Sequence, residues 1–391
     1  MTTPRPFTLG DVLVRADEPA TLVPDAEYDE ITIKLWGKGV VSRGKVRGGD
    51  VVASRRFVRA GQFILSKIDA RNGAIGIIPP ELDGAIVSND FPSFAIRDTN
   101  LTNSAFLGWM ARSPGFIGLC KAASEGTTNR IRIKESKFFR QEVLLPSPTE
   151  QRAILTHLDG LADKTRQLID YLDAVEADAD RCLANLASRP DLTDAEHLAR
   201  GWTQGCLGDV LRPSGEPVSV QADKEYPNVG VLSYARGLFT KPSISGATTS
   251  AKTLFRIRQR QFIYSRLFAF EGAYALVMEE HDGAFVSNEF PAFDIEPELA
   301  SPQFLYAYFR SPHVWEAIAQ SSKGLGDRRQ RVQPAQLLGH RLWLPPRRQL
   351  ELLGNVVPSI VALKARHVAL RKACAALVPA TLERLFARQF G

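Results

Sequence analysis

The sequence predicts an α+β protein made of two similar globular modules and an antiparallel pair of long helices. Two observations carry this prediction. An internal repeat spans most of the 391 residues, and a glycine-poor segment with helical periodicity follows each copy of it. The composition, with 44% hydrophobic and 24% charged residues, is that of an ordinary globular protein and excludes a chain disordered as a whole.

The repeat is clearest in the middle of each copy. The segment 83–92 (DGAIVSNDFP) recurs as 282–291 (DGAFVSNEFP), and between residues 62 and 94 a shift of 199 gives 17 identities in 33 positions. The match extends outward, because LGDV at 9–12 recurs at 207–210 and Leu-Pro at 145–146 recurs at 344–345. A period this long indicates tandem domains and not a solenoid.

The first part of each copy, residues 1–148 and 201–346, predicts a compact α+β module. It is rich in glycine, proline, valine, isoleucine and phenylalanine. Short apolar runs such as 63–65 and 143–145 are bounded by glycine, asparagine, aspartate and proline, which is typical of strands and turns. Helices are expected to interleave with the strands, for instance at 104–111 and 302–310.

The second part of each copy predicts one long helix, with a linker after the first helix. We place the first helix and its linker at 149–200 and the second helix at 347–391. Apolar positions recur at alternating steps of three and four, which is the heptad seam of a coiled coil. Pro358, in the first turns of the second helix, is expected to start or kink it. The seam positions are Leu155, Leu158, Ala162, Thr165, Ile169, Leu172, Glu176, Ala179, Leu183 and Leu186 in the first helix, and Leu353, Val356, Ile360, Leu363, His367, Leu370, Cys374 and Leu377 in the second.

Charge predicts that these two helices pair with each other. Residues 149–180 hold eight acidic against three basic side chains, whereas residues 347–388 hold eight basic against two acidic ones. At 1.5 Å per residue each helix would span about 57 Å. An antiparallel pair with one module at each end gives a pseudo-twofold arrangement, with residues 189–200 linking the first helix to the second module. We interpret His367 on the seam as a packed or partner-bonded side chain.

Most catalytic and membrane classes lack their sequence signals. The four cysteines form no CxxC pair and the six histidines show no metal-ligand spacing, which argues against a metal site and fits a reducing cytoplasm. We find no nucleotide-binding glycine loop, no adenine-methyltransferase loop and no long apolar stretch. A nuclease-like string, Glu135-Ser136-Lys137 with Asp98 upstream, is a weak catalytic alternative. The net charge of +6 favours a polyanionic partner.

Three local strings resemble a known family. SKIDARNGA at 66–74, DGAIVSNDF at 83–91, and the passage from 145 to 151 (LPSPTEQ) into a long helix are similar to type I restriction–modification specificity subunits. The modules resemble target recognition domains of that family, and the order of module, helix, module, helix matches over nearly the whole chain. The second copy departs from the pattern, with FEG at 270–272 where the first copy has RNG at 71–73.

The resemblance implies a cytoplasmic, non-catalytic subunit without cofactors. It would select an asymmetric bipartite sequence in double-stranded DNA, one half-site for each module. It would hold two methyltransferase subunits on its helices, and endonuclease–translocase subunits would join them. Two inverted modules on a rigid spacer would also fit two inverted half-sites at a fixed separation. The alternative is a stand-alone DNA-binding or adaptor protein of another defence or regulatory assembly.

Candidate DNA contacts fall into four groups, each with a structural alternative. A turn after a strand (67–72) could instead be solvated, and the repeated Ser-Asn pairs could be turns that bond their own backbone. Donor-rich loops at 127–132 and 327–331 differ between the copies, as specificity determinants should. Alternating cations at 55–59 and 256–260 could form a charged strand face that binds phosphate or is only solvated. The predicted DNA-contacting residues are Arg59, Lys67, Arg71, Asn72, Ser88, Asn89, Thr128, Asn129, Arg130, Arg132, Arg258, Arg266, Ser287, Asn288, Arg328, Arg329 and Arg331.

Overall fold

The computed structural model describes residues 5–126, 131–320 and 331–390. The chain divides into two compact units, each of which takes part of both long helices. Unit 1 comprises Met1–Ile169 with Leu370–Gly391, and unit 2 comprises Asp170–Ala369. Among the helices that the structure describes, none combines the length and the apolar character needed to cross a membrane.

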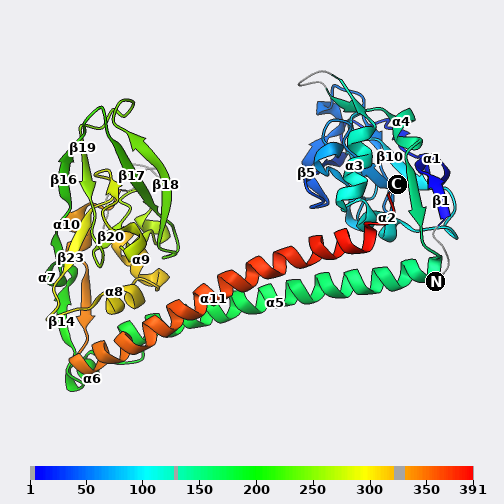
Figure 1. The fold of residues 1–391 in the computed structure, drawn as a ribbon. Helices are drawn as coiled ribbons and strands as arrows, with labels where there is room; N and C mark the ends of the chain where they lie inside the picture. The colour runs from blue at the N-terminus through cyan, green and yellow to red at the C-terminus, as the bar shows by residue number, and fades with distance from the viewer. Residues whose placement is uncertain (1–4, 127–130, 321–330, 391) are drawn as a thin grey trace. The chain divides into compact units, whose positions relative to one another are not determined.

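Unit 1 is a mixed α+β body that contains two main sheets (Figure 1). A five-stranded sheet has the order β3-β6-β9-β4-β5, a four-stranded sheet has the order β2-β10-β7-β8, and β1 pairs with β13. Its elements are β1 (Arg5–Thr8), α1 (Leu9–Val12), β2 (Leu13–Arg15), β3 (Glu18–Pro19), β4 (Glu27–Ile33), β5 (Val40–Arg47), β6 (Arg56–Phe57), β7 (Phe63–Leu65), β8 (Ile75–Ile77), β9 (Ile86–Val87), β10 (Ser93–Ile96), α2 (Ser104–Met110), α3 (Pro114–Ala122), β11 (Ser124–Glu125), β12 (Arg132–Ile133), α4 (Glu135–Phe139), β13 (Glu142–Leu145) and the first half of α5 (Pro148–Ser188).

Unit 2 repeats the same topology. Its five-stranded sheet has the order β16-β19-β22-β17-β18, its four-stranded sheet has the order β15-β23-β20-β21, and β14 pairs with β24. Its elements are α6 (Asp194–Ala199), β14 (Thr203–Cys206), α7 (Leu207–Val210), β15 (Leu211–Pro213), β16 (Glu216–Ser219), β17 (Glu225–Val231), β18 (Leu238–Ser245), β19 (Thr253–Arg256), β20 (Phe262–Tyr264), β21 (Tyr274–Leu276), β22 (Phe285–Val286), β23 (Ala292–Ile295), α8 (Pro302–Tyr308), α9 (Pro312–Gln320), α10 (Pro334–Leu338), β24 (Arg341–Leu344) and the first half of α11 (Arg347–Phe386).

The α+β class and the two long helices are therefore confirmed. α5 begins where the sequence supplies an N-terminal cap, because Ser147 and Glu150 bond each other's backbone N–H groups at 3.0 and 3.4 Å. α11 runs through Pro358 without a break. Within unit 2 the two helices are antiparallel, since Glu176 meets His367 while Asp180, further along α5, meets Lys364.

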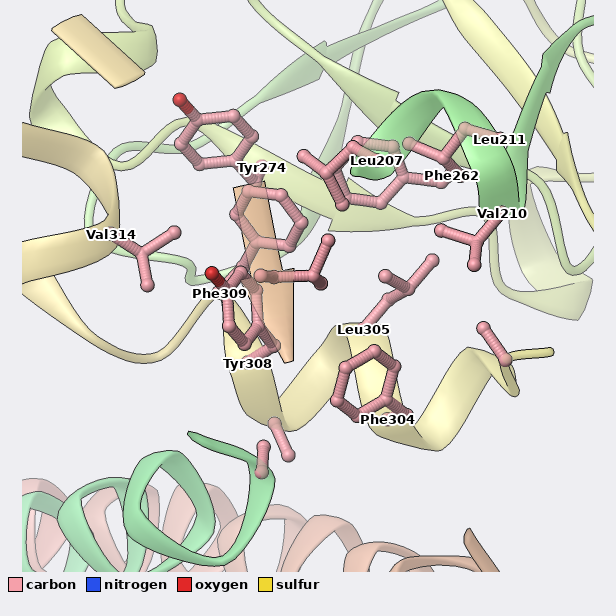
Figure 2. Close-up of a cluster of buried hydrophobic side chains, with 14 of the residues drawn as sticks. Leu207, Val210, Leu211, Phe262, Tyr274, Phe304, Leu305, Tyr308, Phe309 and Val314 are labelled. Carbon is pink, nitrogen blue, oxygen red and sulfur yellow. The ribbon is translucent and has the colours of Figure 1, made fainter. Parts of the chain in front are cut away.

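Each long helix is part of the hydrophobic cores of the units. In unit 2, Leu183 of α5 and Leu353 of α11 join a cluster that contains Phe262, Phe304 and Leu305; Figure 2 shows the aromatic and aliphatic side chains of this cluster. In unit 1, Leu158 and Leu382 join the corresponding cluster. Because apolar burial is the main stabilising term, the helix halves fold as components of the units and not as a separate rod.

The heptad seam of α5 is confirmed, but the one predicted for α11 is partly wrong. The predicted seam residues of α5 are all buried or half-buried. In α11, however, Leu363, Leu370 and Leu377 are exposed, at 36%, 39% and 46%. At these positions the less exposed side chain is the next one along, as with Lys364, whereas Leu353, His367 and Cys374 are buried where the pattern predicts. Lys364 takes its place on the seam because it pairs with Asp180 of α5, which a purely apolar pattern misses.

Two polar pairs stand on the helix seam of unit 2. His367 is buried, and its Nδ1 lies 2.9 Å from Glu176 Oε1, which confirms the partner-bonded interpretation. Lys364 Nζ lies 2.6 Å from Asp180 Oδ1, and Arg310 of the globular part reaches the same oxygen at 3.5 Å. Partly buried polar pairs of this kind favour one register between two helices, because a slip would leave a charge without its partner.

The segment between α5 and β14 is folded onto unit 2. Thr193 and Glu196 form a capping box at the start of α6. His197 is buried, stacks on Trp343 with ring centroids 4.7 Å apart, and meets the edge of Trp202 at 5.3 Å. The linker expected from the sequence is thus an ordered part of the core of unit 2.

Candidate nucleic-acid interface

Three predicted contact segments of unit 1 are neighbours in the structure. The backbone N–H of Lys67 donates to the carbonyl of Asp90 at 2.8 Å, and the N–H of Ile133 donates to the carbonyl of Lys67 at 2.8 Å. The turn after β7, the Ser-Asn loop and the strand β12 therefore form one surface, which we call the loop face of unit 1. Two long-range hydrogen bonds create it, so spacing along the chain does not reveal it.

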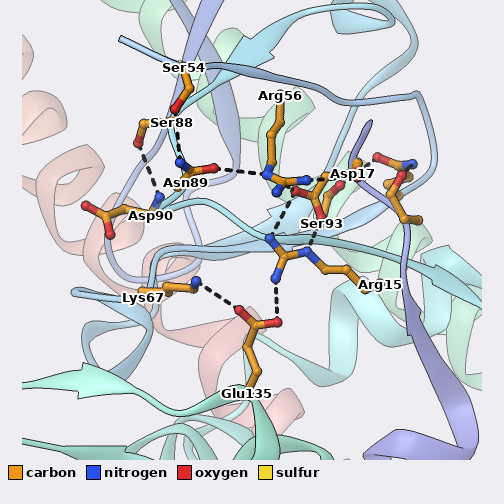
Figure 3. A network of polar contacts seen from close by, with 12 residues as sticks. Arg15, Asp17, Ser54, Arg56, Lys67, Ser88, Asn89, Asp90, Ser93 and Glu135 are labelled. Carbon is orange, nitrogen blue, oxygen red and sulfur yellow. Dashed lines mark hydrogen bonds and ion pairs between the residues drawn. The ribbon is translucent and has the colours of Figure 1, made fainter. Parts of the chain in front are cut away.

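Carboxylates hold the cations of the loop face, and Figure 3 shows the pair that Lys67 forms with Glu135. Lys67 Nζ lies 2.9 Å from Glu135 Oε1, and Arg132 Nη1 lies 2.7 Å from Asp90 Oδ1. Each cation is thus oriented by an acid from a different segment. A phosphate would have to compete with these carboxylates for the cations. The competition lowers the net free energy of phosphate binding but favours a phosphate that meets the cations in the correct geometry.

An arginine pair behind these residues extends the network. Arg15 bonds both Asp17 and Glu135, and Arg56 Nε lies 3.0 Å from Asp17 Oδ2. The side chain of Asp17 is fully buried, and its hydrogen bond raises the pKa of Arg15. Arg56 also donates to Asn89 Oδ1 at 2.9 Å. The network places two arginines and two carboxylates directly behind the loop face.

This arrangement favours the ionised form of Glu135. Burial alone would raise the pKa of its carboxyl group, but hydrogen bonds from Arg15 and Lys67 outweigh burial and hold the pKa below 4.5. Lys137, the other member of the nuclease-like string, is paired with Glu125 instead. Glu135 therefore serves as an anchor for two cations, which does not support the nuclease alternative. Within the described ranges no cluster of three or more histidine, cysteine, aspartate or glutamate side chains could hold a metal ion.

The turn residues and the Ser-Asn pairs divide into structural and available groups. The N–H groups of Asp90 and Glu289 donate to the Oγ atoms of the serines two residues earlier, both at 3.4 Å, as the turn alternative expects. Asn72 Nδ2 donates to Asp69 Oδ1 at 3.2 Å. Arg71, in the portion of the chain that the structure covers, makes no hydrogen bond or ion pair and is therefore available to a ligand.

The predicted charged strand face around Arg59 and Arg258 is wrong. β6 ends at Phe57 and β19 ends at Arg256, so both arginines follow their strands instead of lying on them. Arg59 Nη2 lies 3.7 Å from Glu18, and Arg258 Nη2 lies 2.9 Å from Glu216. These two ion pairs are equivalent in the repeat, which favours a structural role. Thr128, Asn129, Arg130, Arg328 and Arg329 lie outside the described residues.

Unit 2 builds its loop face on the same backbone. The N–H of Arg266 donates to the carbonyl of Glu289 at 2.9 Å, and the N–H of Val332 donates to the carbonyl of Arg266 at 2.9 Å. Glu289 holds both cations, with Arg266 Nη1 at 3.8 Å and Arg331 Nε at 3.4 Å. Arg132 and Arg331 therefore occupy equivalent places, each half exposed and each paired with the acid of the Ser-Asn loop.

The side chains around this shared backbone differ between the units. Where unit 1 has Arg15, Asp17, Arg56 and Glu135, unit 2 has residues that carry no side-chain charge, and they line a hollow of about 320 Å³. Asn288, at the rim, makes no side-chain hydrogen bond within the described residues. Its unit 1 counterpart, Asn89, accepts a hydrogen bond from Arg56, which unit 2 lacks. The uncharged residues that replace the four charged ones in unit 2 are Pro213, Gly215, Phe255 and Pro334.

An exposed aromatic residue stands beside the loop face in both units. Trp36 is 70% exposed and Tyr234 is 62% exposed, and both have a φ of +62°. Left-handed backbone is costly for aromatic residues and is kept only where the surroundings impose it. Here the N–H of Trp36 bonds Asn72 and that of Tyr234 bonds Glu271, at 3.0 and 2.7 Å. Their aromatic character was visible in the sequence, whereas their strain was not.

Comparisons with solved structures cover almost the whole chain. The HsdS subunit of Thermoanaerobacter tengcongensis is 18% identical, with 99% of this chain and 97% of that chain covered and a TM-score of 0.51. A chain of a type I R-M system, from work on complex assembly and conformational transition, is 19% identical, with 98% and 96% covered and a TM-score of 0.60. No family model matches the sequence, and no curated protein matches it. Over nearly its full length, this chain has the fold of a type I restriction–modification specificity subunit.

Proposed function

We propose that this chain is the DNA sequence-specificity subunit of a type I restriction–modification complex. The observation that carries the proposal is the pair of loop faces, which share one backbone and differ in their side chains. Readers of two different half-sites need a common scaffold and different base contacts. Residues 1–148 and 201–346 are then two target recognition domains, and the target is bipartite and asymmetric.

The cations of the loop faces support DNA as the ligand. Arg132 and Arg331 are half exposed, and each is held by one carboxylate with room for a second partner. Arginine can bond guanine or phosphate with two parallel N–H groups. The subunit itself performs no chemistry in this proposal; it selects the site where a partner methylates adenine.

The helices support a scaffold role. Leu370 and Leu377 lie seven residues apart on the unit 1 part of α11, and each is at least one-third exposed. Leucines at this spacing form one stripe along a helix, and an exposed apolar stripe marks a binding surface. We propose that methyltransferase subunits dock on the helices and that endonuclease–translocase subunits join them in the cytoplasm.

The first test is a methylome of cells that carry this gene with its partner genes, against a deletion of this gene alone. Loss of adenine methylation at one split, asymmetric motif supports the proposal. Unchanged methylation in a strain whose partners are active would contradict it and would favour a stand-alone binding or adaptor protein.

A matched pair of variants then assigns the half-sites. Arg132→Ala should relax or weaken recognition of one half-site, and Arg331→Ala should do the same for the other. Each truncation removes an equivalent half-exposed guanidinium, so the two variants control for each other. Binding of duplexes altered in one half-site at a time measures the effect. Equal loss at both half-sites from either variant would identify these arginines as phosphate or folding residues.

A further inference from the structure

One short turn differs in chemistry between the units although its backbone is the same. It follows Lys67 in unit 1 and Arg266 in unit 2. The N–H of Asn72 donates to Asp69 O at 2.8 Å, and the N–H of Glu271 donates to Phe268 O at 3.0 Å. The glycine that ends the turn has a φ of +76° in unit 1 and +77° in unit 2. The turn therefore has one backbone geometry in both units and carries two different sets of side chains.

The side chains on this support change from charged to aromatic. Asp69 and Arg71 of unit 1 are replaced by Phe268 and Phe270 of unit 2, which are 44% and 46% exposed. Two half-exposed phenylalanines on one three-residue turn leave apolar surface in water. Such surfaces mark a contact with a partner.

The surroundings of the turn indicate what that partner is. Arg266, two residues before Phe268, and Arg331 provide positive charge on the same loop face. Glu271, on the same turn, is held by Ser233, whose Oγ donates to its carboxylate at 2.7 Å. Because Arg331 is half exposed, this surface fits a partner that is anionic at its edge and apolar at its centre. In the major groove of DNA the apolar group is the 5-methyl of thymine, flanked by the phosphates of both strands.

We propose that Phe268 and Phe270 read thymine in the second half-site through its 5-methyl group. Unit 1 instead presents Arg71, a donor, at the equivalent position. This inference rests on the proposed function, and it adds the chemical basis on which the two half-sites differ. Apolar contact discriminates by the presence of one methyl group, so uracil in place of thymine removes the signal and leaves base pairing intact.

The test uses the chain in complex with its methyltransferase subunits and duplexes containing its split motif. Each thymine of either strand is replaced in turn by deoxyuridine, and binding is measured by titration. We expect about a fourfold loss of affinity for each contacted methyl group in the second half-site, from the transfer free energy of one buried carbon. The F268A/F270A double variant should bind thymine and deoxyuridine duplexes equally.

Two controls keep the result specific. Leu299→Ala truncates another exposed apolar residue of unit 2, 42% exposed on the connection to α8, and should leave the discrimination unchanged. The D69A/R71A variant alters the same turn in unit 1 and should also leave the second half-site's discrimination intact.

Several outcomes overturn the inference. A second half-site without thymine, no discrimination in the unmodified complex, or full discrimination in F268A/F270A each refutes it. Loss of methyltransferase subunits from F268A/F270A with discrimination retained would place the rings at a protein interface. Absence of any split motif would instead refute the proposed function itself, so the two failures are distinguishable.

Discussion

Truncation of Leu353 tests whether α11 belongs to the core of unit 2. Its side chain is completely buried in the cluster that contains Leu183 and Phe262. Leu353→Ala removes three carbons, about 2.4 kcal/mol of transfer free energy at about 0.8 kcal/mol each. The residual cavity raises the expected loss in free energy of unfolding to about 3–4 kcal/mol.

Leu352 provides the matched control, because it is the preceding residue of the same helix and is 42% exposed. Leu352→Ala makes the same chemical change with the same effect on helix propensity, and it should cost less than about 1 kcal/mol. The assay is urea unfolding, with hydrogen exchange of peptides from each unit to identify which one unfolds. With a slope of about 3 kcal/mol per molar, Leu353→Ala should lower the midpoint of unit 2 by about 1 M.

Equal losses at the two positions would refute this reasoning. They would mean that the helix half is a separate element that touches the module without sharing its core. A midpoint shift in unit 1 as large as that in unit 2 would also contradict it, since Leu353 packs within unit 2.

Three further predictions concern the seam, the aromatic turn and the loop face. Leu172→Glu should destabilise the helix pair by several kcal/mol in thermal unfolding, because it buries a carboxylate at a site 4% exposed, whereas Tyr171→Glu, at 66%, should be nearly neutral; similar melting of both would sink the seam assignment. Gly272→Ala should cost more than Gly283→Ala in urea unfolding, because both have a φ near +75° but only the first new Cβ would strike a tryptophan ring, at 2.5 Å; equal costs would disprove the clash. Glu135→Gln should destabilise unit 1 more at pH 7 than below pH 4. A carboxyl group whose folded pKa is depressed stabilises the fold above its unfolded pKa of 4.5 and loses that effect as the pH falls through the folded pKa. A pH-independent difference in stability would show that the ion pairs do not contribute.

The repeat, the α+β class and the two long helices could be predicted because their signals are local. Identity at a shift of 199 and apolar periodicity over about 40 residues need no knowledge of the fold. The same local rule failed at Leu363, which is exposed because the neighbouring Lys364 pairs with Asp180 of α5 and takes the seam position. Periodicity identifies the side of a helix that is apolar on average. Which side chains are buried in the interface depends on the side chains of the helix that packs against it.

The candidate site depended much more on tertiary structure. Lys67, Asn89 and Arg132 were expected separately as DNA contacts, and long-range backbone hydrogen bonds bring them onto one face. Glu135 was noticed in the sequence only as part of a nuclease-like string, because its ion pair with Arg15, 120 residues away, leaves no local pattern. The sequence shows that Arg71 in the first half is replaced by Phe270 in the second. Only the structure shows that both residues stand on the same backbone turn. Local propensity thus determines the elements of this protein, and packing between distant segments decides which side chains a ligand can meet.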